Sequence, residues 1–172
     1  MEKRTTHAKL DIKKDNTFEG IKMQRRKIED RIRRFLSSDR GALLVTGARQ
    51  VGKTYSIRKV CRESGRNFVE INFIDVPAAV QAVNSARNAK ELLFRISALT
   101  DQKLIPHQTI IFFDEVQKAS EIVTAIKFLV EEGSYQYILS GSLLGVELKS
   151  IRSVPVGYMD MIRMYPMDFE EF

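Results

Sequence analysis

The sequence has few of the features that mark secreted or membrane proteins. It contains a single cysteine, Cys61, and no apolar run that approaches the roughly 20 residues needed to cross a bilayer. One cysteine excludes an internal disulfide framework and a multi-cysteine metal site. The N-terminus also lacks the apolar segment of a signal peptide. These absences favour a protein of the reducing cytoplasm that has no membrane partner.

Internal repeats and low-complexity tracts are also absent. The 172 residues are 44% hydrophobic and 29% charged, a balance that suits one compact domain rather than two. Strand-like and helix-like patterns alternate along the chain, which is typical of an α/β fold with a mostly parallel sheet. The predicted strands cover residues 42–45, 68–73, 109–113, 135–139 and 158–164, and the predicted helices cover residues 21–36, 57–63, 80–83, 89–99, 122–130 and 143–149.

The excess positive charge is concentrated at the start of the chain. The net charge is +6; residues 1–40 contain 13 lysines and arginines against 7 acidic residues, whereas residues 41–172 contain 15 of each. We expect residues 1–20 to be a flexible extension, because they are polar and show no regular apolar period. Residues 21–36 have apolar side chains on one helical face and basic side chains on the others. That basic helix could follow the phosphate backbone of a nucleic acid, or it could be an ordinary helix with a solvated outer face.

A phosphate-binding motif follows the first predicted strand. Residues 47–54 fit G-x-x-x-x-G-K-[ST], and the members of the motif are Gly47, Ala48, Arg49, Gln50, Val51, Gly52, Lys53 and Thr54. The two glycines allow a tight turn in which backbone N–H groups surround phosphate oxygens at the start of the next helix. Lys53 would contact the β- and γ-phosphates, and Thr54 would bind Mg²⁺. The alternative is an ordinary glycine-rich turn.

Two carboxylates end the most apolar predicted strand. Residues 109–113 form an unbroken run that suits a strand buried on both faces, and Asp114 and Glu115 follow it directly. Ligands bind at the carboxyl ends of strands in open α/β folds. We therefore expect Asp114 to hold Mg²⁺ and Glu115 to polarise an attacking water molecule. Taken alone, the pair could be a solvent-facing strand end, but the phosphate motif earlier in the chain favours the functional interpretation.

A serine ends the next predicted strand. If residues 135–139 insert between the first and third strands, Ser140 would lie beside the γ-phosphate and could sense its loss on hydrolysis. The alternative is a hydroxyl that makes only a local hydrogen bond.

These motifs favour hydrolysis of ATP. A carboxylate next to the metal ligand is what a hydrolase needs to activate water, whereas a small-molecule kinase does not. The guanine-reading Asn-Lys-x-Asp element does not occur, and Asp114 does not begin a D-x-x-G motif. We expect ATP and Mg²⁺ to be the ligands. Two alternatives stay open: a switch that binds ATP with little turnover, and a DNA-handling motor.

At the level of families, the sequence resembles predicted bacterial and archaeal AAA+ ATPases in which a domain of this kind precedes a C-terminal domain of uncharacterised function. The matching segments are Arg25-Arg26-Lys27-Ile28, Thr46 to Thr54, Phe113-Asp114-Glu115-Val116-Gln117, Leu139-Ser140-Gly141-Ser142 and Tyr165-Pro166-Met167-Asp168-Phe169-Glu170-Glu171-Phe172. The resemblance implies a three-layer P-loop fold whose five strands lie in the order 5-1-4-3-2. Residues 21–172 would form the AAA+ core, and the chain would stop before the helical lid and the following domain.

The resemblance also implies partners. ATP or ADP would be bound, the domain would form a homo-oligomer, and an unidentified protein would act with it. Many relatives have a Gly-Arg pair where this chain has Gly157-Tyr158, in the region where AAA+ proteins place an arginine that contacts the γ-phosphate of a neighbouring subunit. Arg152 is the nearest substitute for that arginine finger. The alternative is that Arg152 is a solvated loop residue.

Overall fold

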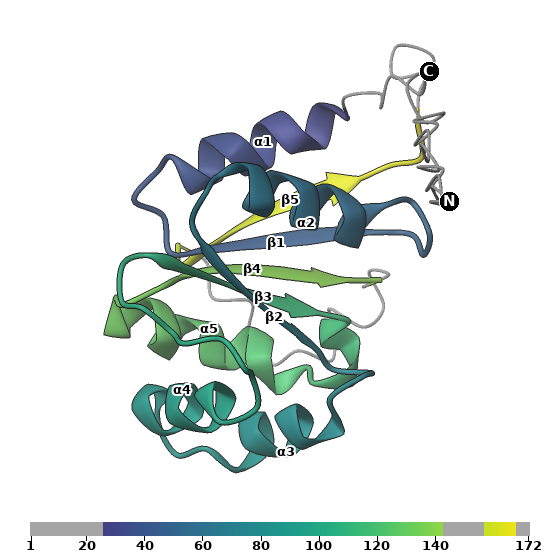
Figure 1. Ribbon diagram of the computed structural model, residues 1–172. Coiled ribbons are helices and arrows are strands. Elements are labelled where there is room, and N and C mark those ends of the chain that lie inside the picture. Colours follow the sequence, from purple (N-terminus) through teal and green to yellow (C-terminus); the bar gives the residue numbers. More distant parts are fainter. Residues whose placement is uncertain (1–25, 143–156, 168–172) are drawn as a thin grey trace, which may run out of the picture.

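The centre of the fold is a five-stranded parallel sheet (Figure 1). The computed structural model describes residues 26–142 and 157–167. The strands are β1 (Ala42–Gly47), β2 (Asn67–Asn72), β3 (Thr109–Asp114), β4 (Gln136–Gly141) and β5 (Met159–Met164). Their order is β2-β3-β4-β1-β5, which is the order 5-1-4-3-2 counted from the other edge. The α/β three-layer fold and its strand order are therefore confirmed.

Helices cover both faces of the sheet. They are α1 (Lys27–Leu36), α2 (Lys53–Glu63), α3 (Pro77–Ser85), α4 (Ala89–Ser97) and α5 (Glu121–Glu132), with a short 3₁₀ helix η1 (Val116–Lys118). Helices α1 and α2 lie on one face, and α3, α4 and α5 lie on the other (Figure 1). None of the helices in residues 26–142 and 157–167 is long and apolar enough to span a bilayer.

Alternate residues of each central strand pack into opposite layers. In β3, Ile111 and Phe113 belong to the core beneath α3, α4 and α5, whereas Ile110 and Phe112 belong to the core beneath α1 and α2. Successive side chains of a strand point to opposite faces, so an unbroken apolar run lets β3 fill both cores. The apolar run that precedes Asp114 is thus an interior strand of the sheet, between β2 and β4.

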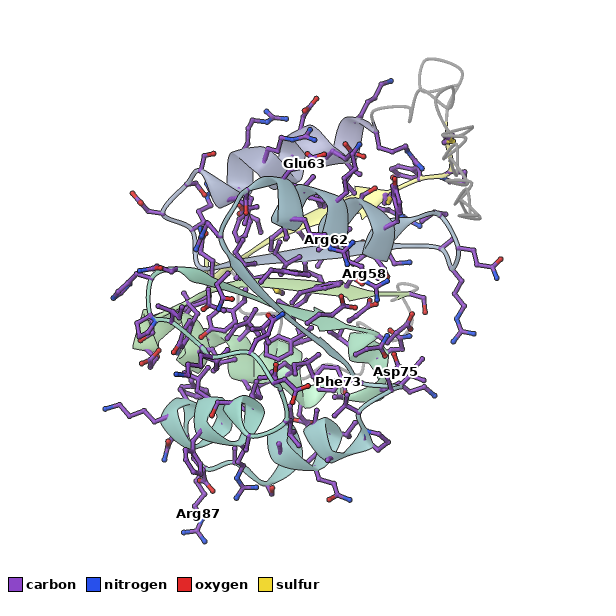
Figure 2. All side chains as sticks on the ribbon, in the orientation of Figure 1. Arg58, Arg62, Glu63, Phe73, Asp75 and Arg87 are labelled. Carbon is purple, nitrogen blue, oxygen red and sulfur yellow. The ribbon has the colours of Figure 1, made fainter. Side chains whose placement is uncertain are left out.

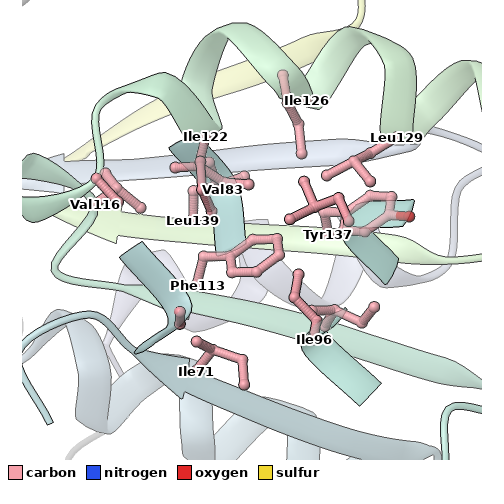
Figure 3. Close-up of a cluster of buried hydrophobic side chains, with 14 of the residues drawn as sticks. Ile71, Val83, Ile96, Phe113, Val116, Ile122, Ile126, Leu129, Tyr137 and Leu139 are labelled. Atoms are coloured by element: carbon pink, nitrogen blue, oxygen red, sulfur yellow. The ribbon is translucent and has the colours of Figure 1, made fainter. Parts of the chain in front are cut away.

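The larger core contains a stack of aromatic rings at the middle of the sheet. Phe113 stacks on Phe73 and on Tyr137, with ring centroids 5.8 and 6.3 Å apart respectively. Isoleucines and leucines from α4 and α5 surround this stack (Figure 3). Because aromatic rings bury large areas and prefer few orientations, this packing holds β3 and β4 rigidly side by side.

Helix α1 has the amphipathic pattern that its sequence predicts. Ile28, Ile32 and Phe35 are buried against the sheet. The same helix also buries the Glu29 carboxylate, which accepts hydrogen bonds from Lys59 Nζ at 2.8 Å and from Arg33 Nη2 at 3.2 Å. Part of its basic charge therefore balances acidic groups of the domain itself.

The carboxyl end of β4 differs slightly from the sequence-based expectation. The predicted strand stops at residue 139, but β4 continues through Gly141 because it pairs with β1 as far as Thr46. Ser140 is therefore part of the strand. The predicted extension at residues 1–20, the predicted helix at 143–149 and Arg152 lie outside the described residues.

Candidate nucleotide site

The loop between β1 and α2 has the backbone shape of a phosphate-binding turn. Gly47 has φ 150° and Gly52 has φ 95°, values that L side chains rarely adopt. A Cβ atom on Gly47 would lie 2.3 Å from the carbonyl oxygen of Met164, the last residue of β5. The loop is thus fitted against β5 at a distance that only glycine permits.

The start of α2 is suited to an anion. Its N-cap residue is Gly52, which has no side chain to cap the helix, and no acidic residue lies in the first turn. The first backbone N–H groups of a helix lack intrahelical partners and carry partial positive charge. A phosphate group placed here would meet these donors without competition from a nearby carboxylate in the same turn.

The Lys53 ammonium group folds back over the loop. Lys53 Nζ donates hydrogen bonds to the carbonyl oxygens of Ala48 at 2.7 Å and of Gly47 at 3.1 Å. Burial lowers the pKa of Lys53, while the nearby charges of Glu115 and Asp114 act in the opposite direction. The loop thus holds a partly desolvated cation whose carbonyl partners a stronger anionic acceptor could replace.

Three oxygen-bearing side chains meet where β3 and β4 end. Asp114 is buried and accepts a hydrogen bond from Thr54 Oγ1 on Oδ2 at 2.9 Å. Its other oxygen, Oδ1, accepts from the buried hydroxyl of Ser140 and from the backbone N–H of Glu115 at 3.0 Å. Hydroxyl and carboxylate oxygens are the protein ligands that Mg²⁺ prefers. The structure brings residues 54, 114 and 140 together at this edge of the sheet. The Ser140 hydroxyl bonds a side chain of the neighbouring strand β3, 26 positions away, and its role toward the γ-phosphate stays a prediction.

Glu115 lies at the edge of this cluster and faces an open groove. Its backbone is left-handed, with φ 57° and ψ 43°. The groove has a volume of about 900 Å³, and its walls come from the phosphate loop, from the length of α2 and from the turn after β2. Arg58, Arg62 and Glu63 follow one another along its α2 side (Figure 2). The phosphate loop and the second carboxylate therefore share one solvent-accessible space.

The structure adds a contact that sequence reasoning missed. Arg26, at the start of α1, donates from Nη1 to the Val51 carbonyl at 3.1 Å and from Nη2 to the Tyr165 carbonyl at 2.8 Å. One guanidinium group thus joins the phosphate loop to the residue that follows β5. The sequence places Arg26 among the basic residues of a helix and in a segment that resembles the family, but it does not indicate the partners, which lie 25 and 139 positions away.

A parallel α/β sheet with a glycine loop, a buried lysine and a strand-end carboxylate at one edge defines the P-loop class of nucleotide-binding domains. A family model described as an AAA domain matches residues 39–172, and the chain belongs to this family. The family membership indicates an ATPase-type P-loop domain. No curated protein matches the chain.

Proposed function

We propose that this domain binds ATP and hydrolyses it to ADP and phosphate in a Mg²⁺-dependent reaction. The observation that carries the proposal is the convergence of the phosphate loop with both strand-end carboxylates. Thr54 Oγ1 lies 2.9 Å from Asp114 Oδ2, although 60 positions separate the two residues. A threonine or an aspartate alone would not indicate ATP hydrolysis. The contact between Thr54 and Asp114 next to Lys53 supports the proposed reaction.

In this proposal the loop residues bind and orient the triphosphate. Backbone N–H groups of residues 47–54 surround the phosphates, and Lys53 exchanges its carbonyl partners for β- and γ-phosphate oxygens. Thr54 and Asp114 are the residues that would hold Mg²⁺, and the ion, when bound, would supply positive charge to the phosphate oxygens. Among residues 26–142 and 157–167, no group of three or more His, Cys, Asp and Glu side chains offers another metal site.

Glu115 is the residue we assign to the attacking water. The water oxygen forms a bond to the γ-phosphorus while the bond from that phosphorus to the β,γ-bridging oxygen breaks. The electron pair of that bond leaves with ADP. Glu115 accepts a hydrogen bond from the water and takes up its proton, which then passes to the phosphate product or to solvent.

Ser140 is proposed to sense the γ-phosphate, and Arg152 is proposed as the arginine finger. For Ser140 to sense the γ-phosphate, its hydroxyl must exchange its present partner, Asp114, for a phosphate oxygen. Arg152 as an arginine finger stays a prediction, because it lies outside the described residues.

The test is Glu115→Gln, which keeps the shape of the side chain but removes its basicity. We expect phosphate release to fall by about 100-fold or more, because general base catalysis typically contributes 10²–10⁴. ATP affinity, measured by calorimetry, should stay within about threefold, since Glu115 does not belong to the phosphate loop. The matched control is Glu121→Gln, an exposed glutamate at the start of α5, which should change neither quantity.

Two results would overturn the proposal. Equal turnover in the wild type and in Glu115→Gln would remove Glu115 from the reaction. Failure of the wild type to bind ATP in the presence of Mg²⁺ would reject the nucleotide site as a whole.

A further inference from the structure

Gln117 is the immediate partner of the Glu115 carboxylate. It lies in η1, two residues after Glu115, and the left-handed backbone of Glu115 turns the chain between them. Gln117 Nε2 donates a hydrogen bond to Glu115 Oε2. The other end of the same amide, Oε1, accepts from the backbone N–H of Ser142 at 3.3 Å.

These two partners define the orientation of the Gln117 amide. An ionised carboxylate only accepts hydrogen bonds, and a backbone N–H only donates them. Rotating the amide by 180° would set its oxygen against the Glu115 carboxylate and its NH₂ against the Ser142 N–H. Only one orientation therefore satisfies both neighbours, and it connects Glu115 to the residue that follows β4.

Residues at the end of β4 are thus connected by hydrogen bonds to both acidic residues of the site, Asp114 and Glu115. Ser140 bonds Asp114 directly through its hydroxyl, and Ser142 reaches Glu115 through the Gln117 amide. β4 lies between β1 and β3, so its end is positioned by the strand that leads into the phosphate loop and by the strand that carries the two acids. A displacement of this end would alter the surroundings of both carboxylates together.

We propose that Gln117 is a positioning residue. It holds the Glu115 carboxylate in the orientation in which that carboxylate can accept a proton from the attacking water. Within residues 26–142 and 157–167, only Oε2 of Glu115 has a hydrogen-bond donor, the Gln117 amide. Gln117 therefore restrains one carboxylate oxygen and leaves Oε1 available to a water molecule. This inference rests on the function proposed for Glu115. It predicts that the Gln117 amide affects turnover and not ATP affinity, because its hydrogen-bond partners, Glu115 and the Ser142 N–H, lie outside the phosphate loop.

The experiment is a double-mutant cycle between Gln117→Met and Glu115→Gln. Methionine has nearly the length of glutamine but neither donates to Glu115 nor accepts strongly from Ser142. Phosphate release is measured under single-turnover conditions, with long time courses so that slow variants give a rate. ATP affinity and thermal midpoint are measured for the same proteins, and Gln81→Met, an exposed glutamine on α3, is the matched control.

We expect Gln117→Met to slow hydrolysis by about tenfold, since small misplacements of catalytic groups cost up to about 100-fold. ATP affinity should stay within about twofold. In the Glu115→Gln background, the same substitution should have no further effect, because the group that Gln117 positions has lost its basicity.

A second variant keeps the test decisive if Gln117→Met folds poorly. Gln117→Glu retains an acceptor for the Ser142 N–H but places a second carboxylate beside Glu115. This variant therefore keeps the bond to Ser142 but removes the donor to Glu115, so turnover should fall as in Gln117→Met. Turnover equal to the wild type would show that residue 117 matters only through its bond to Ser142, which is a structural role.

The outcomes separate the two proposals. If Glu115→Gln hydrolyses ATP at the wild-type rate, the proposed function fails. If Glu115→Gln is slow while Gln117→Met equals the wild type, the positioning role is wrong. An equal slowing by Gln117→Met in both backgrounds would also reject it, since Gln117 would then act on a group other than Glu115.

Discussion

The two ends of one parallel sheet use polar side chains in different ways. At the amino end, two polar side chains bond to the backbone of the connecting loops. Gln136 Nε2 donates to the carbonyls of Ser38 at 2.9 Å and Arg40 at 3.1 Å, and Asn67 Nδ2 donates to the carbonyl of Lys103 at 2.8 Å. These side chains fix the loops that connect the strands to the preceding helices.

At the carboxyl end, the two acidic residues of the site accept hydrogen bonds from other side chains. Thr54 and Ser140 both donate to Asp114, and Gln117 donates to Glu115. Such bonds can exchange for bonds to a ligand without unfolding any strand. The difference suggests that the amino end serves stability and the carboxyl end serves nucleotide chemistry. Substitutions at one end should therefore affect a different measurement from substitutions at the other.

The largest effect should come from Lys53→Met at the carboxyl end. Removing several charge-assisted hydrogen bonds to phosphate should weaken ATP binding by roughly 100-fold, which corresponds to about 3 kcal/mol. The thermal midpoint should change little, because methionine fills a similar space and leaves only two loop carbonyls without their donor. Calorimetric titration and thermal unfolding of one preparation measure both quantities. A large loss of thermal stability with unchanged ATP affinity would contradict the assignment of the carboxyl end to nucleotide binding.

The second effect should come from Thr109→Val at the amino end. The buried Thr109 hydroxyl accepts from Asn67 Nδ2 and from the Ile105 N–H, each at 2.7 Å. Valine keeps the shape but leaves the Ile105 N–H without this acceptor and Asn67 Nδ2 with only the Lys103 carbonyl, so the unfolding free energy should fall by about 1–3 kcal/mol. Urea denaturation measures the loss, and Thr109→Ser, which retains the hydroxyl, should lose less. If the folded Thr109→Val variant bound ATP more weakly than the wild type, the amino end of the sheet would also affect nucleotide binding, and the comparison would be wrong.

Arg26 should sharpen the comparison because it anchors backbone at the carboxyl end. Arg26→Met removes both hydrogen bonds that join the Val51 and Tyr165 carbonyls. We expect ATP affinity to fall about three- to tenfold together with a loss of stability, since the loop loses a support that the folded domain also uses. Arg26→Lys, which can keep one of the two bonds, should lie between. Affinity equal to wild type would show that the loop holds its shape without this contact.

The smallest effect concerns pH. Burial lowers the pKa of Lys53 below its ordinary value, so the free protein loses this proton at a lower pH than an exposed lysine does. A bound phosphate favours the charged amine, and binding above that pKa must therefore also take up a proton. ATP affinity should decline as pH rises through the lowered pKa, by at most about tenfold per pH unit. Lys53→Met should show no such decline between the same pH values.

Much of the fold follows from local sequence patterns. The unbroken apolar run before Asp114 indicates a strand buried on both faces, and the helical spacing of Ile28, Ile32 and Phe35 indicates the buried face of α1. The glycine spacing at residues 47 and 52 likewise predicts a tight loop before α2. Each of these signals lies within a few residues, which is the range over which backbone geometry and side-chain periodicity act.

Local sequence patterns do not predict which residues contact one another in the site. Which serine would meet Asp114 depends on β4 inserting between β1 and β3. The bond from Arg26 to Tyr165 depends on the start of α1 lying beside the end of β5. The partner of Glu115 depends on a left-handed turn that returns Gln117 to it. No periodicity encodes these contacts. The first two arise from the packing of separate elements, and the third arises from the backbone turn at Glu115.

The sequence by itself therefore determined that this chain has a glycine loop, a lysine and two acids at the ends of strands. Those features depend on local geometry and on the chemistry of single residues. Only the tertiary structure decided how they are held: Asp114 by Thr54 and Ser140, Glu115 by Gln117, and the loop by Arg26. The reason is that a hydrogen bond forms according to distance in space, and distance along a chain constrains that only weakly once the chain has folded.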